Sequence, residues 1–484
     1  MSIFRIQTKG ETKSIHELLQ GNLAFPCAGN HTCGKCKVRI TGNVLPPEAG
    51  ELKFLSQEEL QNGIRLACFA QVCGDAVVET MEERHSIAAY RDEIPPKTPG
   101  EGAVCAVDIG TTTVVAALYS AETGRLLSQQ MEPNVQKAYG ADVISRIESC
   151  KKYGVDTLSR AIRGQVETMY QKAISRAGVA SAAKMVVTGN TTMLHIWEGL
   201  SPESIGVYPF DTVSLFGTFS SFHHAYLPRC VGAYVGADVM CSVTASGMLS
   251  QEENSILADM GTNGEMALYR DGKLTCCSTA AGPAFEGAGL SCGSAAVDGA
   301  VSAARLRDGK LELAVIGGGE PKSICGSGII SLVSLFKDLE IIDETGRFTE
   351  IPCEAAGRLE GDSFILDGTS IGISQQDIRQ IQLAKSAICA GILTLSQETD
   401  TPLEEIGKLY IAGGFGAHID IGEAVNIGLI PEAFREKCVV LGNAALGGAA
   451  MLALGYEEPG QIYSEFSLSA SSTFMDYYVD CMMF

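Results

Sequence analysis

The stretch Cys27-Ala-Gly-Asn-His-Thr-Cys33-Gly-Lys-Cys36 places three cysteines in one short, glycine-containing loop. A fourth cysteine, Cys68, follows after 31 intervening residues. Four cysteine thiolates are what a [2Fe–2S] cluster requires, and three of them can come from one loop while the fourth returns from a distant segment. We therefore predict that the ligands of a [2Fe–2S] cluster are Cys27, Cys33, Cys36 and Cys68.

Two other uses of four cysteines have to be weighed. A structural zinc site usually pairs two short C-x2–4-C knuckles, whereas this chain has one C-x2-C and two solitary partners. A disulfide framework needs an oxidising compartment, and the first residues, Met1 to Ile6, lack the basic and then apolar pattern of a signal peptide. Cys73 is interpreted as a small buried residue of the next strand rather than as a ligand.

The segments around the cysteines predict one small domain over residues 1–82. Ser14 and Glu17 have the spacing of a capping box, which marks the start of a helix, and a second capped helix is expected from Ser56. Apolar and alternating runs predict strands at 3–6, 37–40 and 76–79. This order of elements suits a β-grasp fold. The three-plus-one cysteine arrangement resembles that of plant- and adrenodoxin-type ferredoxins.

The composition of the 484 residues excludes several classes of protein. Apolar residues make up 46% and charged residues 19%, and 54 residues are glycine, as in a compact, loop-rich α/β enzyme. The formal net charge is −21 without a basic run, so nucleic acid is not an expected partner. No apolar stretch reaches about 18 residues, so no membrane span is expected, and residues 444–454 are interpreted as a buried helix. We expect a cytoplasmic protein.

Residues 83–102 separate the cysteine-rich domain from the rest of the chain. The segment from Arg91 to Gly102 contains three prolines, two glycines and several charges, which favour a semi-extended linker. Such a linker could let the cluster domain move between an electron donor and an acceptor. The alternative is a fixed strap between packed domains.

Two similar loops follow apolar strands in residues 103–484. The first is Asp108-Ile-Gly110-Thr111-Thr112-Thr113, and the second is Asp259-Met-Gly261-Thr262-Asn263-Gly264-Glu265. Glycine lets the backbone approach a phosphate, threonine supplies donors, and the acid suits a magnesium ion held through water. Either loop alone could be an ordinary turn capped by its own acid. Two copies about 150 residues apart favour a duplicated α/β domain that clamps a polyphosphate.

A third loop, Ile411-Ala-Gly413-Gly414-Phe415-Gly416, can lie flat against an adenine or a ribose. The order of the three loops resembles the superfamily of acetate and sugar kinases, heat-shock ATPase chaperones and actin. This resemblance covers residues 103–484 and implies two RNase-H-like lobes with ATP and Mg2+ between them. It implies magnesium and water positioning by Asp108 and Asp259. It implies nucleotide binding by Gly110, Thr111, Thr112, Gly261, Thr262, Asn263, Gly413, Gly414 and Gly416.

Other polar residues in this part are candidates of lower specificity. Glu265 and Glu286 lie in glycine-rich segments and could orient the attacking water, and Glu265 joins the candidate catalytic residues; an exposed loop carboxylate is the alternative for both. Residues 188–193 and 323–328 are expected as loops that line the cleft, with simple tight turns as the alternative. His195, in an apolar helix-like segment, is interpreted as a hydrogen-bonded core histidine.

The combination of the two halves is more specific than either half. The chain closely resembles the reductive activators of corrinoid proteins, over essentially its whole length. The segments that carry this resemblance are Pro26-Cys27-Ala-Gly-Asn-His-Thr-Cys33-Gly-Lys-Cys36-Lys-Val, Arg65-Leu-Ala-Cys68, Asp108-Ile-Gly-Thr-Thr-Thr113, Thr188-Gly-Asn-Thr-Thr-Met193 and Asp259-Met-Gly-Thr-Asn-Gly-Glu265.

This resemblance implies an N-terminal [2Fe–2S] domain and a C-terminal ATPase domain. It implies ATP-dependent passage of one electron to Co(II) of a corrinoid protein, which returns the cobalt to Co(I) for methyl transfer. The implied partners are that corrinoid protein, a low-potential electron donor and a second copy of the chain in a homodimer. Longer members of the family carry an extra middle domain, and we expect it to be missing here, because only about twenty linker residues fill that place.

Three rival functions remain open at this point. One is the activation of a different enzyme, such as a 2-hydroxyacyl-CoA dehydratase, although such activators place a [4Fe–4S] cluster at a dimer interface. Another is a metabolite kinase with a redox-sensing domain, which requires a pocket for a small acceptor. The last is an ATP-gated scaffold whose cluster never changes its oxidation state.

Overall fold

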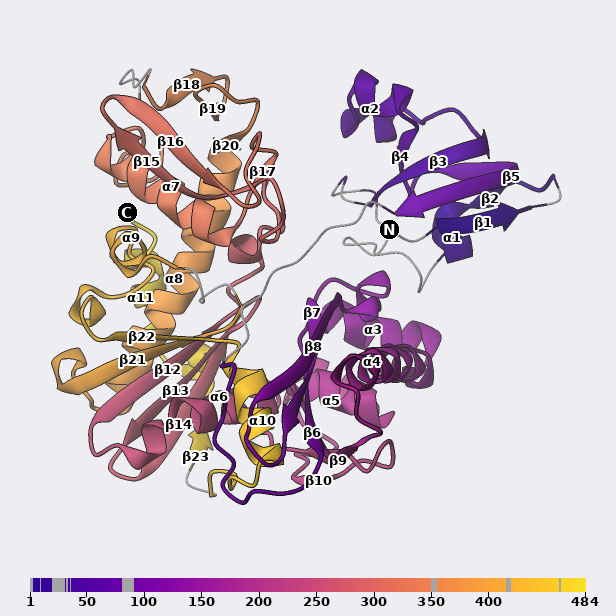
Figure 1. Cartoon of the computed structure of the whole chain (residues 1–484). Coiled ribbons are helices and arrows are strands. Elements are labelled where there is room, and N and C mark those ends of the chain that lie inside the picture. Colours follow the sequence, from indigo (N-terminus) through magenta and orange to yellow (C-terminus); the bar gives the residue numbers. More distant parts are fainter. Residues whose placement is uncertain are drawn as a thin grey trace.

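The structure is a computed structural model that describes residues 3–8, 10–19, 31, 34, 36–80, 91–349, 355–414, 419–460 and 463–484. These residues form an N-terminal domain and two larger lobes, each built on a six-stranded sheet. Lobe I extends from residue 103 to residue 250, and lobe II from residue 254 onward. Figure 1 shows the two lobes side by side, with the N-terminal domain above lobe I.

The N-terminal domain is a small sheet with two short helices. The strand order is β1-β5-β3-β4, and the short strand β2 also pairs with β5. Ser56 and Glu59 form a reciprocal capping box at the start of the second helix, as expected from their spacing (Glu59 N to Ser56 Oγ 3.2 Å, Ser56 N to Glu59 Oε2 2.9 Å). The elements are β1 (Ile3–Gln7), β2 (Lys13–Ser14), α1 (Ile15–Leu19), β3 (Lys37–Val44), α2 (Gln57–Gln61), β4 (Ile64–Leu66) and β5 (Gln71–Thr80).

Lobe I has an antiparallel hairpin pair followed by parallel strands. Its sheet has the order β10-β11-β9-β6-β7-β8, in which β9 is parallel to β6 and β11 is parallel to β9. The long helix α4 buries Leu158, Ile162, Val166 and Met169, which recur every three to four residues and therefore share one face. The elements are β6 (Ala103–Ile109), β7 (Thr113–Ser120), β8 (Leu126–Pro133), α3 (Val143–Tyr153), α4 (Val155–Ala177), β9 (Ala182–Gly189), α5 (Thr191–Glu198), β10 (Thr218–Phe219), β11 (Tyr226–Leu227) and α6 (Ala237–Ser246).

Lobe II repeats the same sheet. Its order is β22-β21-β12-β13-β14-β23, with β12, β13 and β14 antiparallel and β21 and β22 added in parallel. The strands β11-β9-β6-β7-β8 and β22-β21-β12-β13-β14 therefore follow one pattern, so the predicted duplication is present. The elements are β12 (Asn254–Met260), β13 (Gly264–Arg270), β14 (Lys273–Thr279), β21 (Ile406–Ala412), α9 (Ile421–Asn426), β22 (Cys438–Gly442), α10 (Ala444–Ala453), β23 (Tyr463–Glu465) and α11 (Phe474–Asp480).

A subdomain is inserted between β14 and β21. It contains two three-stranded sheets and a buried helix, and it returns to the lobe through the long helix α8, which runs down the centre of lobe II in Figure 1. α8 begins with a capping box between Ser374 and Asp377. The elements are β15 (Ala300–Arg307), β16 (Lys310–Val315), β17 (Ser323–Ile324), α7 (Gly326–Asp338), β18 (Gly357–Glu360), β19 (Ser363–Leu366), β20 (Gly372–Ser374) and α8 (Gln375–Glu398).

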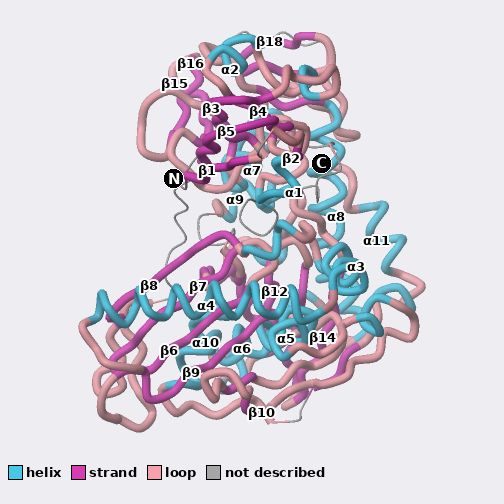
Figure 2. Tube along the Cα trace, turned by 90° about the vertical axis from the view of Figure 1, so that its right-hand side faces the viewer, coloured by secondary structure: helices cyan, strands magenta, loops and turns pink. Residues whose placement is uncertain are grey.

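The helices α6 and α10 pack against each other where the two lobes meet. α10 directly follows β22 of lobe II, yet it packs on β6 and β9 of lobe I, and it lies beside α6 in Figure 2. A Cβ atom added at Gly448 would lie 1.9 Å from the carbonyl oxygen of Cys241, so only glycine permits this approach. The apolar stretch 444–454 is thus a buried helix, as predicted. Over the described residues, no helix is both long and apolar enough to cross a membrane.

The second half of the predicted linker is a strap on the two lobes. Ile94 N donates to Gly124 O at 2.9 Å, in the turn between β7 and β8, and Lys97 N donates to Leu454 O at 3.0 Å, at the end of α10. Ile94 is only 3% exposed and belongs to the same apolar cluster as α10. From residue 91 onward the fixed-strap alternative therefore describes the chain. Residues 83–90 lie outside the described part.

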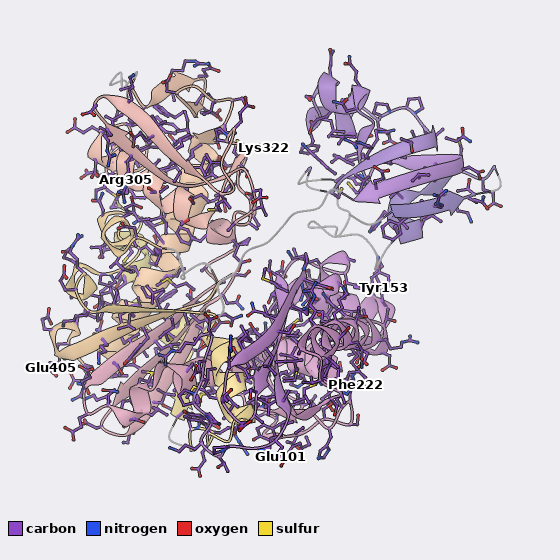
Figure 3. The ribbon with its side chains drawn as sticks, viewed as in Figure 1. Glu101, Tyr153, Phe222, Arg305, Lys322 and Glu405 are labelled. Atoms are coloured by element: carbon purple, nitrogen blue, oxygen red, sulfur yellow. The ribbon has the colours of Figure 1, made fainter. Side chains whose placement is uncertain are left out.

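Aromatic side chains complete the core of lobe I. Phe222, labelled in Figure 3, lies edge-on to the fully buried Trp197, with ring centroids 5.3 Å apart. Trp197 Nε1 donates to Ser220 Oγ at 3.3 Å, so its buried polar atom is satisfied. This packing fixes α5, whose N-cap residue Asn190 contacts the loop between β6 and β7.

Candidate functional site

The two predicted phosphate loops lie close together where the two lobes face each other. The loop from Asp108 to Thr113 joins β6 to β7, and the loop from Asp259 to Glu265 joins β12 to β13. Glu286 connects them: Thr112 Oγ1 donates to Glu286 Oε2 at 2.7 Å, and Thr262 Oγ1 donates to Glu286 Oε1 at 3.0 Å. One carboxylate thus accepts hydrogen bonds from a threonine of each lobe.

The first residue of each motif, Asp108 in β6 and Asp259 in β12, accepts a hydrogen bond from a residue of the other lobe. Asp108, from lobe I, accepts from Asn443 Nδ2 at 3.1 Å, and Asn443 is the N-cap of α10. Asp259, from lobe II, accepts from Ser242 Oγ of α6 at 3.4 Å. Both carboxylates therefore have partners beyond their own backbone, which favours a shared site over two isolated capped turns.

A third aspartate, Asp238, lies in the same acidic cluster and was missed in the sequence. It is in the first turn of α6. Burial, and then the charges of Asp259 and Asp108, raise the pKa of Asp238 to about 8. The available signal was the run Val235-Gly236-Ala237-Asp238, in which glycine precedes an acid at a helix start. Its relation to the two loops became visible only through the packing of α6 against lobe II.

Burial and mutual repulsion dominate the electrostatics of the cleft. Burial raises the pKa of Asp108 to about 7, with the charge of Asp259 acting in the same direction and the Asn443 hydrogen bond opposing both. Burial raises the pKa of Asp259 to about 6, aided by the charge of Glu286 and opposed by Ser242. Such an assembly of carboxylates is stabilised when a cation enters.

Glu265 is a strand residue rather than a loop residue. It is in β13, directly opposite Asp259 of β12, and it is 8% exposed. Burial, and then the charges of Asp238 and Asp259, raise the pKa of Glu265 well above its usual value. The expected alternative of an exposed loop carboxylate is therefore wrong for Glu265. β12 ends at Met260 and β13 begins at Gly264, so the turn between them is shorter than its glycines and threonine suggested, and Glu265 lies in the strand.

In the part of the chain that the structure describes, these carboxylates do not converge as direct ligands of a metal ion. Among the described residues, no group of three or more His, Cys, Asp or Glu side chains converges closely enough to hold a metal ion. Magnesium commonly keeps several waters and is completed by substrate phosphates.

The predicted adenosine loop begins directly beside the second phosphate loop. Gly413 follows β21 with φ +99°, and a Cβ atom there would lie 2.7 Å from Met260 O and 2.9 Å from Asp259 Oδ1. Glycine is therefore required for β21 to end against the carboxylate. Gly414 is the next residue, and Gly416 lies outside the described residues.

Two of the four predicted cluster ligands lie in the described part of the N-terminal domain. Cys36 and Cys68 are buried, and Cys68 N donates to Cys36 Sγ at 3.4 Å. A backbone N–H directed at a sulfur is suited to a thiolate ligand. Cys27 and Cys33 lie outside the described residues. The described pair fits a shared cluster, and Cys73 lies in β5 as expected, although it is half-buried rather than buried.

A buried ion pair fixes the segment that carries Cys68. Glu51 accepts from Arg65 Nε at 2.9 Å, from Arg65 Nη2 at 2.7 Å and from Leu66 N at 2.7 Å. Arg65 also donates to Leu45 O at 2.7 Å. On the other side, a ring nitrogen of His31 lies 3.0 Å from Cys68 O, and its ring stacks on Phe69.

The remaining predicted positions have mainly structural surroundings. His195 is fully buried, with Nδ1 2.7 Å from Thr191 O and Nε2 accepting from Ser214 N at 3.3 Å, so the core-histidine interpretation is confirmed. The segment 188–193 is not a loop throughout, because α5 starts at Thr191 with Asn190 as its N-cap. The segment 323–328 is likewise not a loop throughout, because Ser323 and Ile324 form β17 and α7 starts at Gly326.

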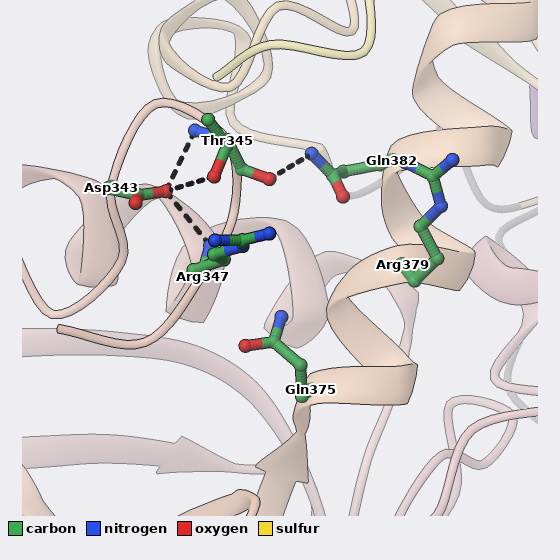
Figure 4. Close-up of a pocket in the computed structure, with 6 residues that line it drawn as sticks. All are labelled: Asp343, Thr345, Arg347, Gln375, Arg379 and Gln382. Carbon is green, nitrogen blue, oxygen red and sulfur yellow. Dashed lines mark hydrogen bonds between the residues drawn. The ribbon is translucent and has the colours of Figure 1, made fainter.

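A separate polar hollow of about 570 Å³ lies in lobe II, away from these loops (Figure 4). Gln382 Nε2 donates to Thr345 O at 3.0 Å, which fixes the loop that forms one wall. None of the predicted site residues lines it. Its lining residues are Asp343, Thr345, Arg347, Gln375, Arg379 and Gln382.

Three family models match the chain. The model of the 2Fe–2S iron–sulfur cluster binding domain matches residues 5–73, and that of the RACo middle region matches residues 103–251. The model of the C-terminal domain of RACo, the ASKHA domain, matches residues 253–484. The expectation that the family's middle domain is missing is therefore wrong. The stretch that the strand and loop pattern assigned to the first ATPase lobe is itself the middle region.

Two curated proteins and one solved structure are similar to the chain over most of its length. The corrinoid activation enzyme RamQ of Eubacterium limosum is 32% identical over 418 residues, which are 78% of this chain and 70% of the relative. A [Co(II) methylated amine-specific corrinoid protein] reductase of Methanosarcina barkeri is 24% identical over 390 residues, 72% of this chain and 69% of the relative. The solved structure of a reductive activator for corrinoid, iron–sulfur protein is 26% identical, with a TM-score of 0.72 over 97% of this chain and 95% of that one.

A 2Fe–2S domain joined to an ASKHA domain defines a redox ATPase with a cluster at one end and a nucleotide cleft at the other. Within that class, the chain belongs to the RACo family of corrinoid activators.

Proposed function

We propose that this protein passes one electron to the Co(II) centre of a corrinoid protein, regenerating Co(I) for methyl transfer, and that it uses ATP in doing so. The observation that carries this proposal is the match along 97% of the chain to a reductive activator, which spans both the cluster domain and the cleft. In the balanced step, Co(II) gains one electron, and the cluster loses one. A low-potential donor then restores that electron.

The N-terminal domain would hold the cluster by Cys27, Cys33, Cys36 and Cys68. The cluster supplies the one-electron transfer, and the cysteine ligation suits a low potential. The chain's own contribution is positional: the Glu51–Arg65 pair orients the segment leading to Cys68, and the Cys68 N–H is directed at the Cys36 sulfur.

The cleft would bind MgATP between the two phosphate loops. Gly110, Thr111 and Thr112 from lobe I and Gly261, Thr262 and Asn263 from lobe II would hold the phosphates. Gly413, Gly414 and Gly416 would lie against the adenosine. Asp108, Asp238 and Asp259 would hold the hydrated magnesium ion, and Glu265 or Glu286 would take the proton of the attacking water.

ATP must favour one arrangement of the lobes if it is to drive a change in the protein. Glu286 would supply such a difference, because it accepts hydrogen bonds from Thr112 of lobe I and Thr262 of lobe II. Phosphate oxygens would compete for the same two hydroxyl groups. Binding of ATP thus exchanges an internal bridge between the lobes for a bridge through the nucleotide.

The decisive experiment mixes anaerobically purified protein, a chemical reductant and a Co(II) corrinoid protein from the same organism. The Co(I) absorption band is followed with and without MgATP. ATP-dependent Co(I) formation that is lost in Cys33→Ala and in Asp259→Ala is the expected result. Arg358→Gln, which removes an exposed ion pair with Glu360, serves as the control. A cluster that is reduced normally while no corrinoid protein responds would contradict the proposal.

A further inference from the structure

Arg146, on α3, is a cation enclosed by lobe I. It is 0% exposed, and among the described residues it forms no ion pair. Its guanidinium donates to neutral acceptors instead: Nε to Gly140 O at 3.1 Å, Nη1 to Gln136 Oε1 at 3.5 Å, and Nη2 to Thr111 O. Arginines are rarely buried without an acidic partner, because removing the charge from water is costly.

Burial also changes the protonation equilibrium of the Arg146 guanidinium. Burial lowers the pKa of Arg146 to about 9, and the charges of Asp142 and Cys150 oppose this effect. Asp142 is exposed, and its carboxylate accepts from Ser145 N at 2.8 Å as the N-cap of α3. The protein therefore keeps an arginine where its positive charge lacks a close counter-ion, in the part of the chain that the structure describes.

The position of this charge is directly behind the first phosphate loop. Arg146 and Asn134 together hold the three carbonyl groups of the loop: Asn134 Nδ2 donates to Gly110 O at 2.8 Å, Asn134 N to Thr112 O at 3.0 Å, and Arg146 Nη2 to Thr111 O. In a trans peptide the carbonyl and the next N–H point in opposite directions. The N–H groups that follow these carbonyls are consequently turned away from α3.

These N–H groups are available for an anion. Among the described residues, neither Thr111 N nor Thr112 N has a hydrogen-bond acceptor. Thr111 Oγ1 is held separately by Asn190 Nδ2 at 3.2 Å, so the loop is fixed from a second direction. Successive backbone N–H groups that face one side form an anion-binding concavity. The loop therefore has the N–H groups of Thr111 and Thr112 on one side and the buried guanidinium of Arg146 on the opposite side.

We propose that Arg146 is a positioning residue for the polyphosphate of ATP. It holds the Thr111 carbonyl so that the loop N–H groups face the nucleotide, and its charge is compensated only when the phosphates are bound. This inference rests on the proposed ATP site and adds to it a source of selectivity. A triphosphate carries more negative charge than a diphosphate, so ATP depends on Arg146 more strongly than ADP does.

The test measures equilibrium affinity for ATP and for ADP by calorimetry on the full chain, without any corrinoid protein. Arg146→Gln keeps donor groups but removes the charge, and Arg146→Lys keeps the charge. We expect Arg146→Gln to weaken ATP binding on the order of 10–100-fold, and ADP binding several-fold less, because a partly buried charge interacts with each phosphate charge by a few kcal/mol or less. Arg146→Lys is expected to restore most of the ATP affinity.

Asn134→Ala is the matched control, because Asn134 holds the same loop without a charge. It is expected to weaken ATP and ADP binding equally. Equal losses for both nucleotides in Arg146→Gln, or ATP affinity unchanged from the parent protein, would overturn the inference and leave Arg146 a purely structural clamp. If thermal unfolding shows that Arg146→Gln does not fold, Arg146→Lys is compared with the parent protein instead. Because Arg146→Lys keeps the charge, it should keep the preference for ATP over ADP. Loss of that preference in Arg146→Lys would contradict the role of the charge. Failure of the parent protein to bind ATP would instead contradict the proposed function.

Discussion

At the scale of single residues, the main electrostatic feature of the site is a set of carboxyl groups whose pKa values are raised by burial. The pKa values of Asp108 and Asp238 are raised to about 7 and about 8. An unfolded aspartate ionises near pH 4, so between about pH 4 and about pH 8 the folded state keeps protons that the unfolded state has lost. The free energy of unfolding therefore falls as the pH rises through this window.

The substitution Asp238→Asn tests whether the buried carboxylate lowers the free energy of unfolding at high pH. We expect the variant to be more stable than the parent protein by roughly 1–3 kcal/mol at about pH 8 in a chelator, and by less at about pH 5, where Asp238 is already protonated. The measurement is chemical unfolding at the two pH values, and magnesium-dependent ATP hydrolysis should be lost in the same variant. Asp367→Asn, at an exposed position, is the control. Equal destabilisation at both pH values would refute the explanation.

At the scale of elements, the short strand β4 depends on the Glu51–Arg65 pair. Glu51 is fully buried and Arg65 is 6% exposed, so removal of the arginine leaves an unpaired carboxylate inside the domain. We expect Arg65→Ala to lower the stability of the N-terminal domain by about 3–5 kcal/mol and to reduce the iron and sulfide bound per chain. Visible absorption and metal analysis measure this effect.

The matched change is Arg39→Ala, because the ion pair between Arg39 and Glu79 is exposed and 3.9 Å long. Exposed pairs contribute about 0–1 kcal/mol, so its cluster content should remain that of the parent protein. Equal loss of iron in Arg39→Ala and Arg65→Ala would show that the cluster responds to any charge change in the domain rather than to the buried pair.

Elements with a strong local pattern could be predicted from the sequence. The strand β1 and the buried helix α10 were expected close to their observed positions, because periodicity and apolar runs are local signals. The proposed ligands Cys27, Cys33 and Cys36 and the two proposed phosphate loops rest on equally local signals, because spacing within a few residues defines them. The β-grasp and the two-lobed ASKHA architecture followed from these segments.

Contacts between distant segments were beyond prediction from one sequence. Asp238 joins the cleft only because α6 packs against lobe II, and Arg146 reaches Thr111 across 35 positions of the chain. Glu286 was a candidate on account of its glycine-rich surroundings, but its bonds to both Thr112 and Thr262 depend on how the lobes meet. The strap from residue 91 onward was left open for the same reason.

At the scale of the whole molecule, the contact between α6 and α10 holds the two lobes together. Gly448→Ala places a Cβ atom against the Cys241 carbonyl, so the helices must separate. We expect a loss of about 1–3 kcal/mol in stability, as for overpacking of a core, together with weaker coupling between the lobes. Thermal unfolding and hydrogen exchange in residues 108–113 and 259–265 measure the two effects.

The same substitution at Gly164 is the control with the opposite sign. Gly164 lies inside α4 with open space where a Cβ atom would be, so alanine should stabilise the helix by up to about 1 kcal/mol. If Gly448→Ala were as well tolerated as Gly164→Ala, close approach of the two helices would not be a requirement of the fold.

The strap has a mechanical consequence for the delivery of electrons. Lys97 is bonded to Leu454 at the end of α10, and Ile94 is bonded to the turn at Gly124, so the tether of the cluster domain is anchored beside the contact about which the lobes would turn. A point near an axis of rotation moves less than any point farther out. The point at which the chain joins the lobes, at Ile94 and Lys97, would therefore shift little as the lobes turn. Nucleotide would then act on the arrangement of the lobes without displacing the point from which the N-terminal domain is joined to them.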